Sequence, residues 1–193
     1  MSLYPITEQL LTKLIWEVHL MKRKRLLFIG GTMGVGKTTL GKYLVDQKLE
    51  NAAFLDGDWC WYMHPWVFSD ENKKMVINNI QFLLNGYLHH STFETVVFVW
   101  VMDQQQTIND ILSGLTGDYD FYNVSLIATA SELKRHFEKD TQNGIREFND
   151  LFGALRRLSM YQKINSIKIS VTNSNLQESA NHLIALLNAK PEK

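Results

Sequence analysis

The chain has 193 residues, of which 45% are apolar and 21% are charged, and its 20 basic residues balance its 20 acidic ones. This length and composition predict one globular domain, large enough to bury a proper core, and the longest apolar run, 96–102, is far too short to span a bilayer. The balanced charge argues against nucleic acid or an anionic membrane surface as a partner.

The N-terminal segment is expected to form an amphipathic helix from Pro5 to about Met21, because apolar residues recur there every four positions. It lacks the uninterrupted apolar stretch of a secretory signal. We therefore treat 1–22 as a helical extension of a domain that covers 23–193. The extension either packs on this domain or forms a dimer contact, so a monomer and a homodimer are both open.

A glycine-rich motif of the form G-x-x-x-x-G-K-[ST] lies between an expected strand, Arg25 to Gly30, and an expected helix that begins at Thr39. Backbone N–H groups in such a loop, together with the N-terminus of the next helix, form an anion site. In this motif Lys37 reaches the β- and γ-phosphates and Thr38 Oγ reaches Mg²⁺. The residues predicted to bind the nucleotide are Gly31, Thr32, Met33, Gly34, Val35, Gly36, Lys37, Thr38 and Thr39.

Two carboxylates follow the second expected strand, in the sequence Asp56-Gly57-Asp58. The glycine between them permits a turn, so that one carboxylate faces the metal and the phosphates while the other faces an acceptor. We predict that Asp56 helps to hold Mg²⁺ and that Asp58 takes the proton from an acceptor hydroxyl. A plain surface turn is the alternative. The single cysteine, Cys60, is expected to pack rather than react, and it fits a reducing cytoplasm.

Aromatic rings crowd the segment after these carboxylates, and flat rings suit a nucleobase, a sugar face or an aromatic compound. Trp59 and Tyr62, together with Trp100 further along the chain, are predicted to contact this acceptor; core packing is the alternative for any single ring. Between Asp56 and Leu88 the only lysines or arginines are Lys73 and Lys74. The acceptor is therefore expected to be uncharged or aromatic rather than strongly anionic. The crowded side chains are Trp59, Trp61, Tyr62, His64, Trp66 and Phe68.

The rest of the chain alternates expected helices and strands, which indicates a parallel sheet covered on both faces, with ligands at the carboxyl ends of its strands. Asp103 either ligates the metal or caps the helix that follows it. Ser69, Ser131 and a capping box formed by Ser174 and Gln177 are expected to begin three other helices. The expected order is helix 70–88, strand 95–102, helix 103–115, strand 121–128, a helix after 131, loop 139–146, helix 147–163, strand 166–171 and a last helix.

The glycine-rich motif, with Leu55-Asp56-Gly57-Asp58-Trp59 after it, resembles small P-loop kinases of the nucleoside-monophosphate-kinase fold. This group includes gluconate, shikimate and adenylylsulfate kinases, chloramphenicol phosphotransferase and zeta-toxin-like kinases. The resemblance implies an α/β fold, a three-layer α/β/α sandwich whose five-stranded parallel sheet has the order 2-3-1-4-5. It also implies ATP with Mg²⁺ and a mobile lid, here about 139–146.

In this family the lid usually carries arginines that neutralise the transferring phosphoryl group. Arg135 and Arg146 fall in the corresponding interval, with Lys139 between them. The resemblance implies that Arg135 clamps phosphates or stacks on the adenine, and a solvated helix face is the alternative. A dense Arg-x-x-x-Arg cluster, which the family usually has, is missing here.

The leading hypothesis is ATP-dependent phosphoryl transfer to a hydroxyl of a small molecule. One alternative is a nucleotide-binding regulatory protein with an incomplete acceptor site, which the sparse lid favours. Another is an NTPase that uses water as its acceptor, with Asp103 as a metal ligand.

Overall fold

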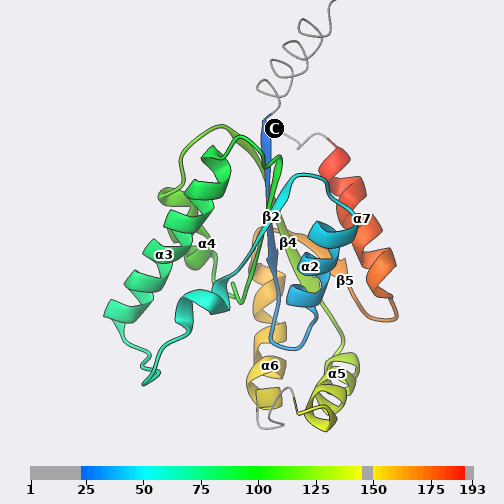
Figure 1. Cartoon of the computed structure of the whole chain (residues 1–193). Helices are drawn as coiled ribbons and strands as arrows, with labels where there is room; N and C mark the ends of the chain where they lie inside the picture. The colour runs from blue at the N-terminus through cyan, green and yellow to red at the C-terminus, as the bar shows by residue number, and fades with distance from the viewer. Residues whose placement is uncertain (1–22, 145–149, 190–193) are drawn as a thin grey trace, which may run out of the picture.

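A computed structural model of the chain describes residues 23–144 and 150–189 (Figure 1). Its five strands are β1 Lys24–Gly30, β2 Ala52–Asp56, β3 Thr95–Trp100, β4 Tyr119–Ile127 and β5 Ile167–Ser170. Its described helices are α2 Lys37–Gln47, α3 Asp70–His89, α4 Gln105–Ser113, α5 Ala130–Gln142, α6 Asp150–Leu158 and α7 Leu176–Asn188. Two short 3₁₀ segments, η1 Gly57–Trp61 and η2 Met160–Lys163, complete the described elements. The expected N-terminal helix and Arg146 lie outside the described residues.

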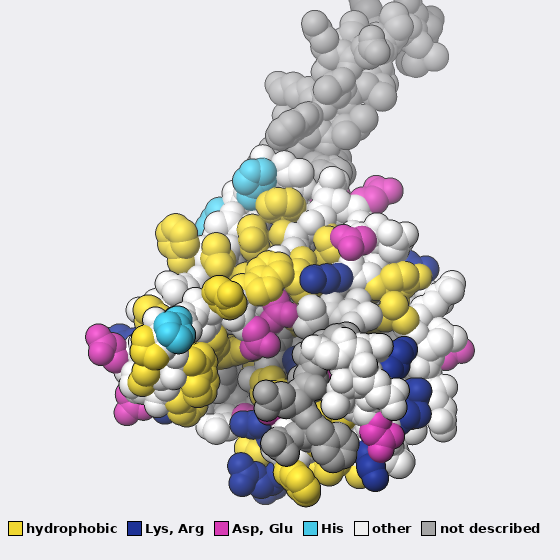
Figure 2. All heavy atoms as spheres, turned by 60° about the horizontal axis from the view of Figure 1, so that its bottom comes forward, with side chains coloured by type: hydrophobic (Ala, Val, Ile, Leu, Met, Phe, Trp, Pro, Cys, Tyr) yellow, Lys and Arg dark blue, Asp and Glu magenta, His cyan; other side chains and the backbone are white. Residues whose placement is uncertain are grey.

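The five strands form one parallel sheet in the order β2-β3-β1-β4-β5, which confirms the predicted fold. The last residue of β1, Gly30, pairs with Trp100 of β3 and with Ser125 of β4. The carboxyl ends of these strands lie at the bottom of Figure 1, the edge that Figure 2 brings toward the viewer. A ligand site at the ends of parallel strands therefore opens on that edge.

Both faces of the sheet are buried, and the alternation of side chains along β1 shows how. Leu27 and Ile29 belong to a core that includes residues of α2, α5, α6 and α7, whereas Leu26 and Phe28 belong to a core with α3, α4 and η2. All four side chains are fully buried. Figure 1 shows α3 and α4 on one side of the sheet and α2 and α7 on the other. This burial explains why β1 is a continuous apolar run rather than an alternating one.

Helix starts differ from the sequence-based expectations at three of four positions. Ser69 does begin α3, since its Oγ accepts a hydrogen bond from the N–H of Asn72. The side chain of Thr129, not Ser131, caps α5, and the residue before α4 is Gln104, so Asp103 is not its cap. The capping box of α7 is formed by Asn175 and Glu178, one residue later than expected. Ser, Thr and Asn are all good N-caps, so the path of the incoming chain decides among neighbours.

The segment expected to be a loop at 139–146 is partly helical. Helix α5 continues to Gln142 because the side chains of Leu133 and Phe137 are buried against the core, and the helix ends before Gly144, whose φ of 67° is left-handed. The loop prediction is therefore wrong over 139–142, while 145–149 lie outside the described residues. Among the helices that the structure describes, none is long and apolar enough to cross a membrane.

Candidate active site

The glycine-rich loop joins β1 to α2 at the carboxyl edge of the sheet. Gly34 and Gly36 have φ values of 76° and 102°, in the left-handed region that residues with a Cβ rarely adopt. Gly36 is the N-cap of α2, and no side chain caps this helix. The first N–H groups of α2 thus meet the loop without a side-chain acceptor, as an anion site requires.

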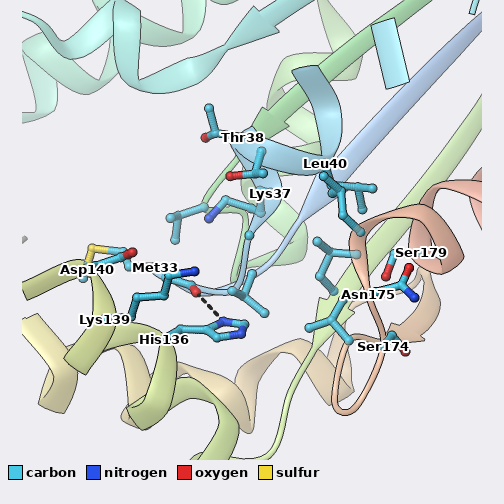
Figure 3. A pocket seen from close by; sticks show the side chains of 18 of the residues that line it. Met33, Lys37, Thr38, Leu40, His136, Lys139, Asp140, Ser174, Asn175 and Ser179 are labelled. Atoms are coloured by element: carbon cyan, nitrogen blue, oxygen red, sulfur yellow. Dashed lines mark hydrogen bonds between the residues drawn. The ribbon is translucent and has the colours of Figure 1, made fainter. Parts of the chain in front are cut away.

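A cavity of about 520 Å³ opens above this loop, and helices α5 and α7 contribute its other walls. Figure 3 shows Lys37 and Thr38 on one side, His136 and Lys139 of α5 across from them, and the start of α7 on a third side. The residues predicted from the motif that line the cavity are Met33, Gly34, Val35, Gly36, Lys37, Thr38 and Thr39.

Two of the predicted residues of the glycine-rich loop, Gly31 and Thr32, do not line this cavity. Thr32 is fully buried, and its Oγ1 donates to the carbonyl of Ala154 in α6 at 2.8 Å. Its own carbonyl accepts a hydrogen bond from Lys37 Nζ at 3.0 Å. The side chain of Thr32 therefore fixes the loop to the fold, a role that the motif alone does not reveal.

Asp56 connects the loop to the second strand. Its side chain is 5% exposed, its Oδ2 accepts a hydrogen bond from Thr38 Oγ1 at 2.7 Å, and its Oδ1 accepts one from the backbone N–H of Asp58 at 3.1 Å. A hydroxyl and a carboxylate that converge beside a phosphate site are hard oxygen ligands of the kind Mg²⁺ prefers. The described residues contain no cluster of three or more His, Cys, Asp and Glu side chains for a metal, but Mg²⁺ needs few protein ligands when phosphates supply the others.

A second cavity of about 710 Å³ lies next to the first, and Asp58 lines both. Trp100, at the end of β3, also lines the second cavity, and its Nε1 donates to Asp58 Oδ1 at 3.1 Å. The structure thus brings the predicted Asp58 and Trp100 together at the junction of the two cavities.

Aromatic rings form one wall of this second cavity. The ring centroids of Trp61 and Phe68 are 5.7 Å apart and those of Trp66 and Phe68 are 5.9 Å apart, in stacked arrangements. Figure 2 shows hydrophobic side chains gathered on the left of this face. Tyr62 also lines the cavity, although its side chain is 97% exposed. Trp59 does not line it and packs against Phe54 instead.

The lining of the second cavity also includes polar side chains and a charged pair that the sequence did not reveal. Arg157 Nε of α6 donates to Asp103 Oδ2 at 2.9 Å, and both residues line the second cavity. Asp103 is therefore neither the helix cap nor part of the first cavity's lining. The other basic residue of this lining, Lys73, pairs with Asp70 at 2.9 Å. Each basic residue in the described lining thus has an acidic partner.

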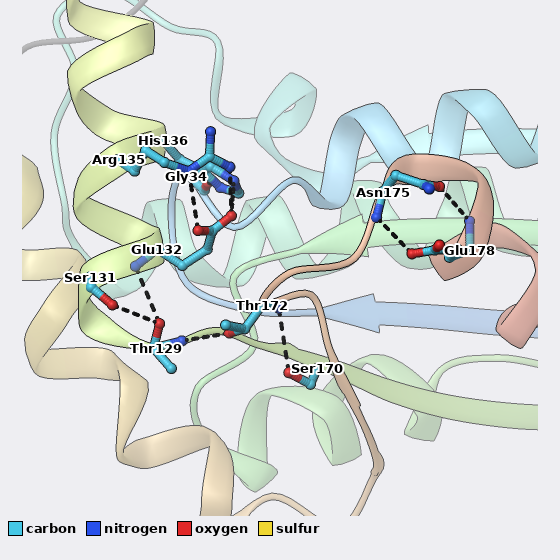
Figure 4. Close-up of polar contacts among 10 residues, drawn as sticks. All are labelled: Gly34, Thr129, Ser131, Glu132, Arg135, His136, Ser170, Thr172, Asn175 and Glu178. Atoms are coloured by element: carbon cyan, nitrogen blue, oxygen red, sulfur yellow. Dashed lines mark hydrogen bonds and ion pairs between the residues drawn. The ribbon is translucent and has the colours of Figure 1, made fainter.

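Arg135 does not line the nucleotide cavity, contrary to its predicted role there. Its guanidinium binds Glu132 through two hydrogen bonds, and the Arg135 side chain is 65% exposed (Figure 4). This hydrogen bonding holds the pKa of the Glu132 carboxyl below its usual value. The next residue, His136, turns inward: its Nδ1 lies 3.1 Å from the carbonyl oxygen of Gly34 and its Nε2 lies 3.1 Å from Glu132 Oε1.

Residues near the ends of β4 and β5 are the main ones to which sequence reasoning gave no role. His136 and Asp140 follow β4, together with Lys139, which was noted only as a basic residue of the lid interval, and a group that begins at Ser174 follows β5. The rule that ligands lie at the carboxyl ends of parallel strands was the available signal, because both groups come shortly after a strand. It did not show which side chains of α5 face inward.

Comparison with known families finds that a family model described as AAA domain matches residues 27–151, well over half of the chain. Comparison with curated proteins finds no match. Among solved structures, the tunicamycin resistance protein of Deinococcus radiodurans is 16% identical with a TM-score of 0.65, covering 86% of this chain and 96% of its own.

Two kinases show the same fold. A gluconokinase from Sinorhizobium meliloti 1021 is 15% identical, with a TM-score of 0.60 and coverage of 89% of this chain and 99% of its own. The shikimate kinase from Acinetobacter baumannii in complex with shikimate is 18% identical, with a TM-score of 0.58 and coverage of 90% and 98%. At these identities the likeness concerns the fold, which is that of P-loop kinases.

Proposed function

The chain belongs to the AAA domain family, and on that premise we propose that it transfers the γ-phosphoryl group of ATP to a hydroxyl of a small molecule. One observation carries the proposal: the carboxylate-bearing residue Asp58 lines both the cavity above the phosphate loop and the aromatic cavity beside it. Phosphoryl transfer needs a carboxylate at this junction, since the acceptor hydroxyl must lose its proton as it attacks the phosphorus.

On the nucleotide side, the loop amides and Lys37 hold the phosphates. Thr38 and Asp56 are the residues that would hold Mg²⁺, with Asp56 acting through water. When bound, Mg²⁺ supplies charge that neutralises the phosphate oxygens. Lys37 reaches the β- and γ-phosphates by leaving the Thr32 carbonyl that it contacts in the structure.

We assign the lid cation to Lys139 rather than to Arg135. Lys139 and His136 line the nucleotide cavity from α5, whereas Arg135 points at Glu132. Lysine neutralises phosphate as a point charge, without the bidentate geometry of arginine. Lys139→Ala is expected to weaken ATP turnover more than Arg135→Ala does. Steady-state ATP kinetics of the two variants measure this, and equal losses would contradict the assignment.

We propose that the acceptor is uncharged and presents a flat face. The stacked rings of Trp61, Trp66 and Phe68 offer an apolar surface to such a face. A carboxylate or phosphate on the acceptor would need an unshared cation, but Arg157 is paired with Asp103 and Lys73 with Asp70. The solved structures of similar fold include a sugar kinase and a tunicamycin resistance protein, and we infer a sugar-like or nucleoside-like acceptor from the same combination of fold and aromatic wall.

The partner of this protein is thus a small molecule rather than nucleic acid or membrane, and the single Cys60 favours a cytoplasmic location. Both are proposals that rest on composition.

The test is ATP consumption by the full chain with a panel of sugars, nucleosides, aromatic glycosides and antibiotics, with phosphorylated product identified by mass spectrometry.

Lys37→Ala is expected to abolish turnover, while Asp58→Asn keeps ATP binding and loses transfer. Lys42→Ala and Asp46→Asn, two exposed positions on α2, are the matched controls and should behave as wild type. Full transfer by Asp58→Asn would remove that residue from its role. Hydrolysis unaffected by every acceptor would indicate an NTPase, and binding without turnover a regulator.

A further inference from the structure

We propose that Trp100 is a positioning residue, which holds the Asp58 carboxylate in one orientation by donating its indole N–H to Oδ1. The proposal rests on the function proposed above and adds a residue to its mechanism. Trp100 ends the central strand β3, and its Nε1 lies 3.1 Å from Asp58 Oδ1. Because the five residues of β3 before Trp100 are buried, the indole projects from a rigid element toward the carboxylate of Asp58, which is exposed.

The backbone of Asp58 is held from the other side. Its N–H donates to Asp56 Oδ1, and Asp56 Oδ2 accepts from Thr38 in the phosphate loop. A continuous chain of hydrogen bonds therefore runs from Trp100 through Asp58 and Asp56 to Thr38. It spans the two cavities, so that the carboxylate keeps a fixed place relative to the phosphate loop.

Gly57 makes this arrangement possible. A Cβ at this position would lie 2.4 Å from Cγ of Trp100, so the indole ring packs against the bare backbone of the glycine. Gly57 is itself buried. Gly57 therefore does more than allow the chain to turn. Its lack of a side chain leaves room for the indole of Trp100, which donates to Asp58.

The chemical consequence follows from the requirements of a general base. A carboxylate on an exposed turn samples several rotamers, whereas proton abstraction needs one oxygen at hydrogen-bond distance from the acceptor hydroxyl. Tying Oδ1 to Trp100 restricts the side chain before the acceptor arrives, which reduces the entropy lost in reaching the reactive geometry.

The test removes the donor without removing the ring. In the full chain, Trp100 is replaced by benzothienylalanine, whose sulfur stands where the indole has its N–H, and in a second variant by phenylalanine. The side-chain orientation of Asp58 is followed by the three-bond NMR couplings to its carboxyl carbon that report χ1, assigned with Asp58→Asn. The same benzothienylalanine replacement at Trp66, whose ring stacks on Phe68, is the matched control for the couplings.

Loss of the hydrogen bond is expected to give rotamer-averaged couplings for Asp58 in both Trp100 variants and to leave the single-rotamer couplings unchanged in the Trp66 control. If Trp100 only fills space, the benzothienylalanine variant will keep the couplings of wild type, and that result overturns the proposal. This readout needs no acceptor, so it stands even if kinase activity is not found. With an acceptor in hand, kcat should fall about tenfold while the KM for ATP stays unchanged.

Discussion

Asp56 and Asp58 are two residues apart, yet their surroundings give them different roles. Asp56 is 5% exposed and accepts hydrogen bonds from the hydroxyl of Thr38 and from the backbone N–H of Asp58. Asp58 is exposed, lines both cavities and meets Trp100. A buried carboxylate that is fully engaged suits a structural and metal-organising role, whereas one at the surface of a cavity suits contact with substrate.

Cys60 reports on the charge of Asp56. Burial raises the pKa of the Cys60 thiol, and the negative charge of Asp56 adds to this effect. The reactive thiolate should therefore form only at a pH above that at which a free cysteine ionises, and neutralising Asp56 should lower that pH again. The pH dependence of iodoacetamide labelling of wild type and Asp56→Asn, with N-acetylcysteine as the reference, measures both shifts.

Because Cys60 is the only cysteine of the chain, every alkylation event reports on it. A labelling midpoint at or below that of N-acetylcysteine would contradict the raised pKa of the Cys60 thiol, and an unchanged midpoint in Asp56→Asn would show that Asp56 does not act on it.

Helix α5 and the phosphate loop form one packed unit at the scale of elements. A Cβ on Gly34 would lie 2.5 Å from the ring of Phe137, and the carbonyl of the same glycine meets His136. The loop conformation therefore depends on where α5 sits, although the two segments are about a hundred residues apart in the chain.

Gly34→Ala is expected to lower the free energy of unfolding by about 1–2 kcal/mol, because alanine disfavours the left-handed φ of 76° and its Cβ clashes with Phe137. ATP affinity should fall with it. Gly86→Ala is the control: this residue lies inside α3, nothing is within 4 Å of an added Cβ, and the change should stabilise by about 0.5–1 kcal/mol. Chemical denaturation gives the free energy of unfolding of both variants. Equal changes of the same sign would contradict the specific role of Gly34.

The residue that caps the N-terminus of α7 is Asn175, one position after the expected Ser174. Asn175 accepts from the N–H of Glu178 at 2.9 Å, and Glu178 Oε2 accepts from the N–H of Asn175 at 3.0 Å (Figure 4). Asn175→Ala should therefore destabilise the protein by about 1 kcal/mol. Ser174→Ala should change stability by less than about 0.5 kcal/mol. Thermal unfolding distinguishes the two variants. A larger loss of stability in Ser174→Ala than in Asn175→Ala would favour the capping box of Ser174 and Gln177 that was expected from the sequence.

Binding at the phosphate loop should stabilise the whole molecule, since strands and helices from both halves of the chain line the nucleotide cavity. At a hundred times its dissociation constant, Mg²⁺–ATP should add about 2.7 kcal/mol, which corresponds to a rise in Tm of roughly 5–10 °C for a domain of this size. AMP, which lacks the β- and γ-phosphates, should give a smaller rise. Lys37→Ala should give almost none. Thermal-shift measurements that find no response to ATP or GTP in wild type would rule out the nucleotide site.

The sequence by itself determined the phosphate loop, the five parallel strands and the pair of carboxylates after β2, because each is encoded in contiguous residues. The geometry of a turn or a buried strand depends mainly on neighbouring side chains and backbone freedom. The order of the sheet came from resemblance to a family with these motifs, and the structure confirms it.

The tertiary structure alone decided which distant side chains meet. Arg135 and His136 are adjacent in sequence, but successive residues of a helix point about 100° apart, so only the docking of α5 against the loop selects His136 and Lys139 for the cavity. The pairing of Asp103 with Arg157 joins the end of β3 to α6, across 54 positions of the chain. The contact of Trp100 with Asp58 depends on two strand ends that lie side by side. These contacts depend on how elements pack, and a linear pattern carries little information about packing.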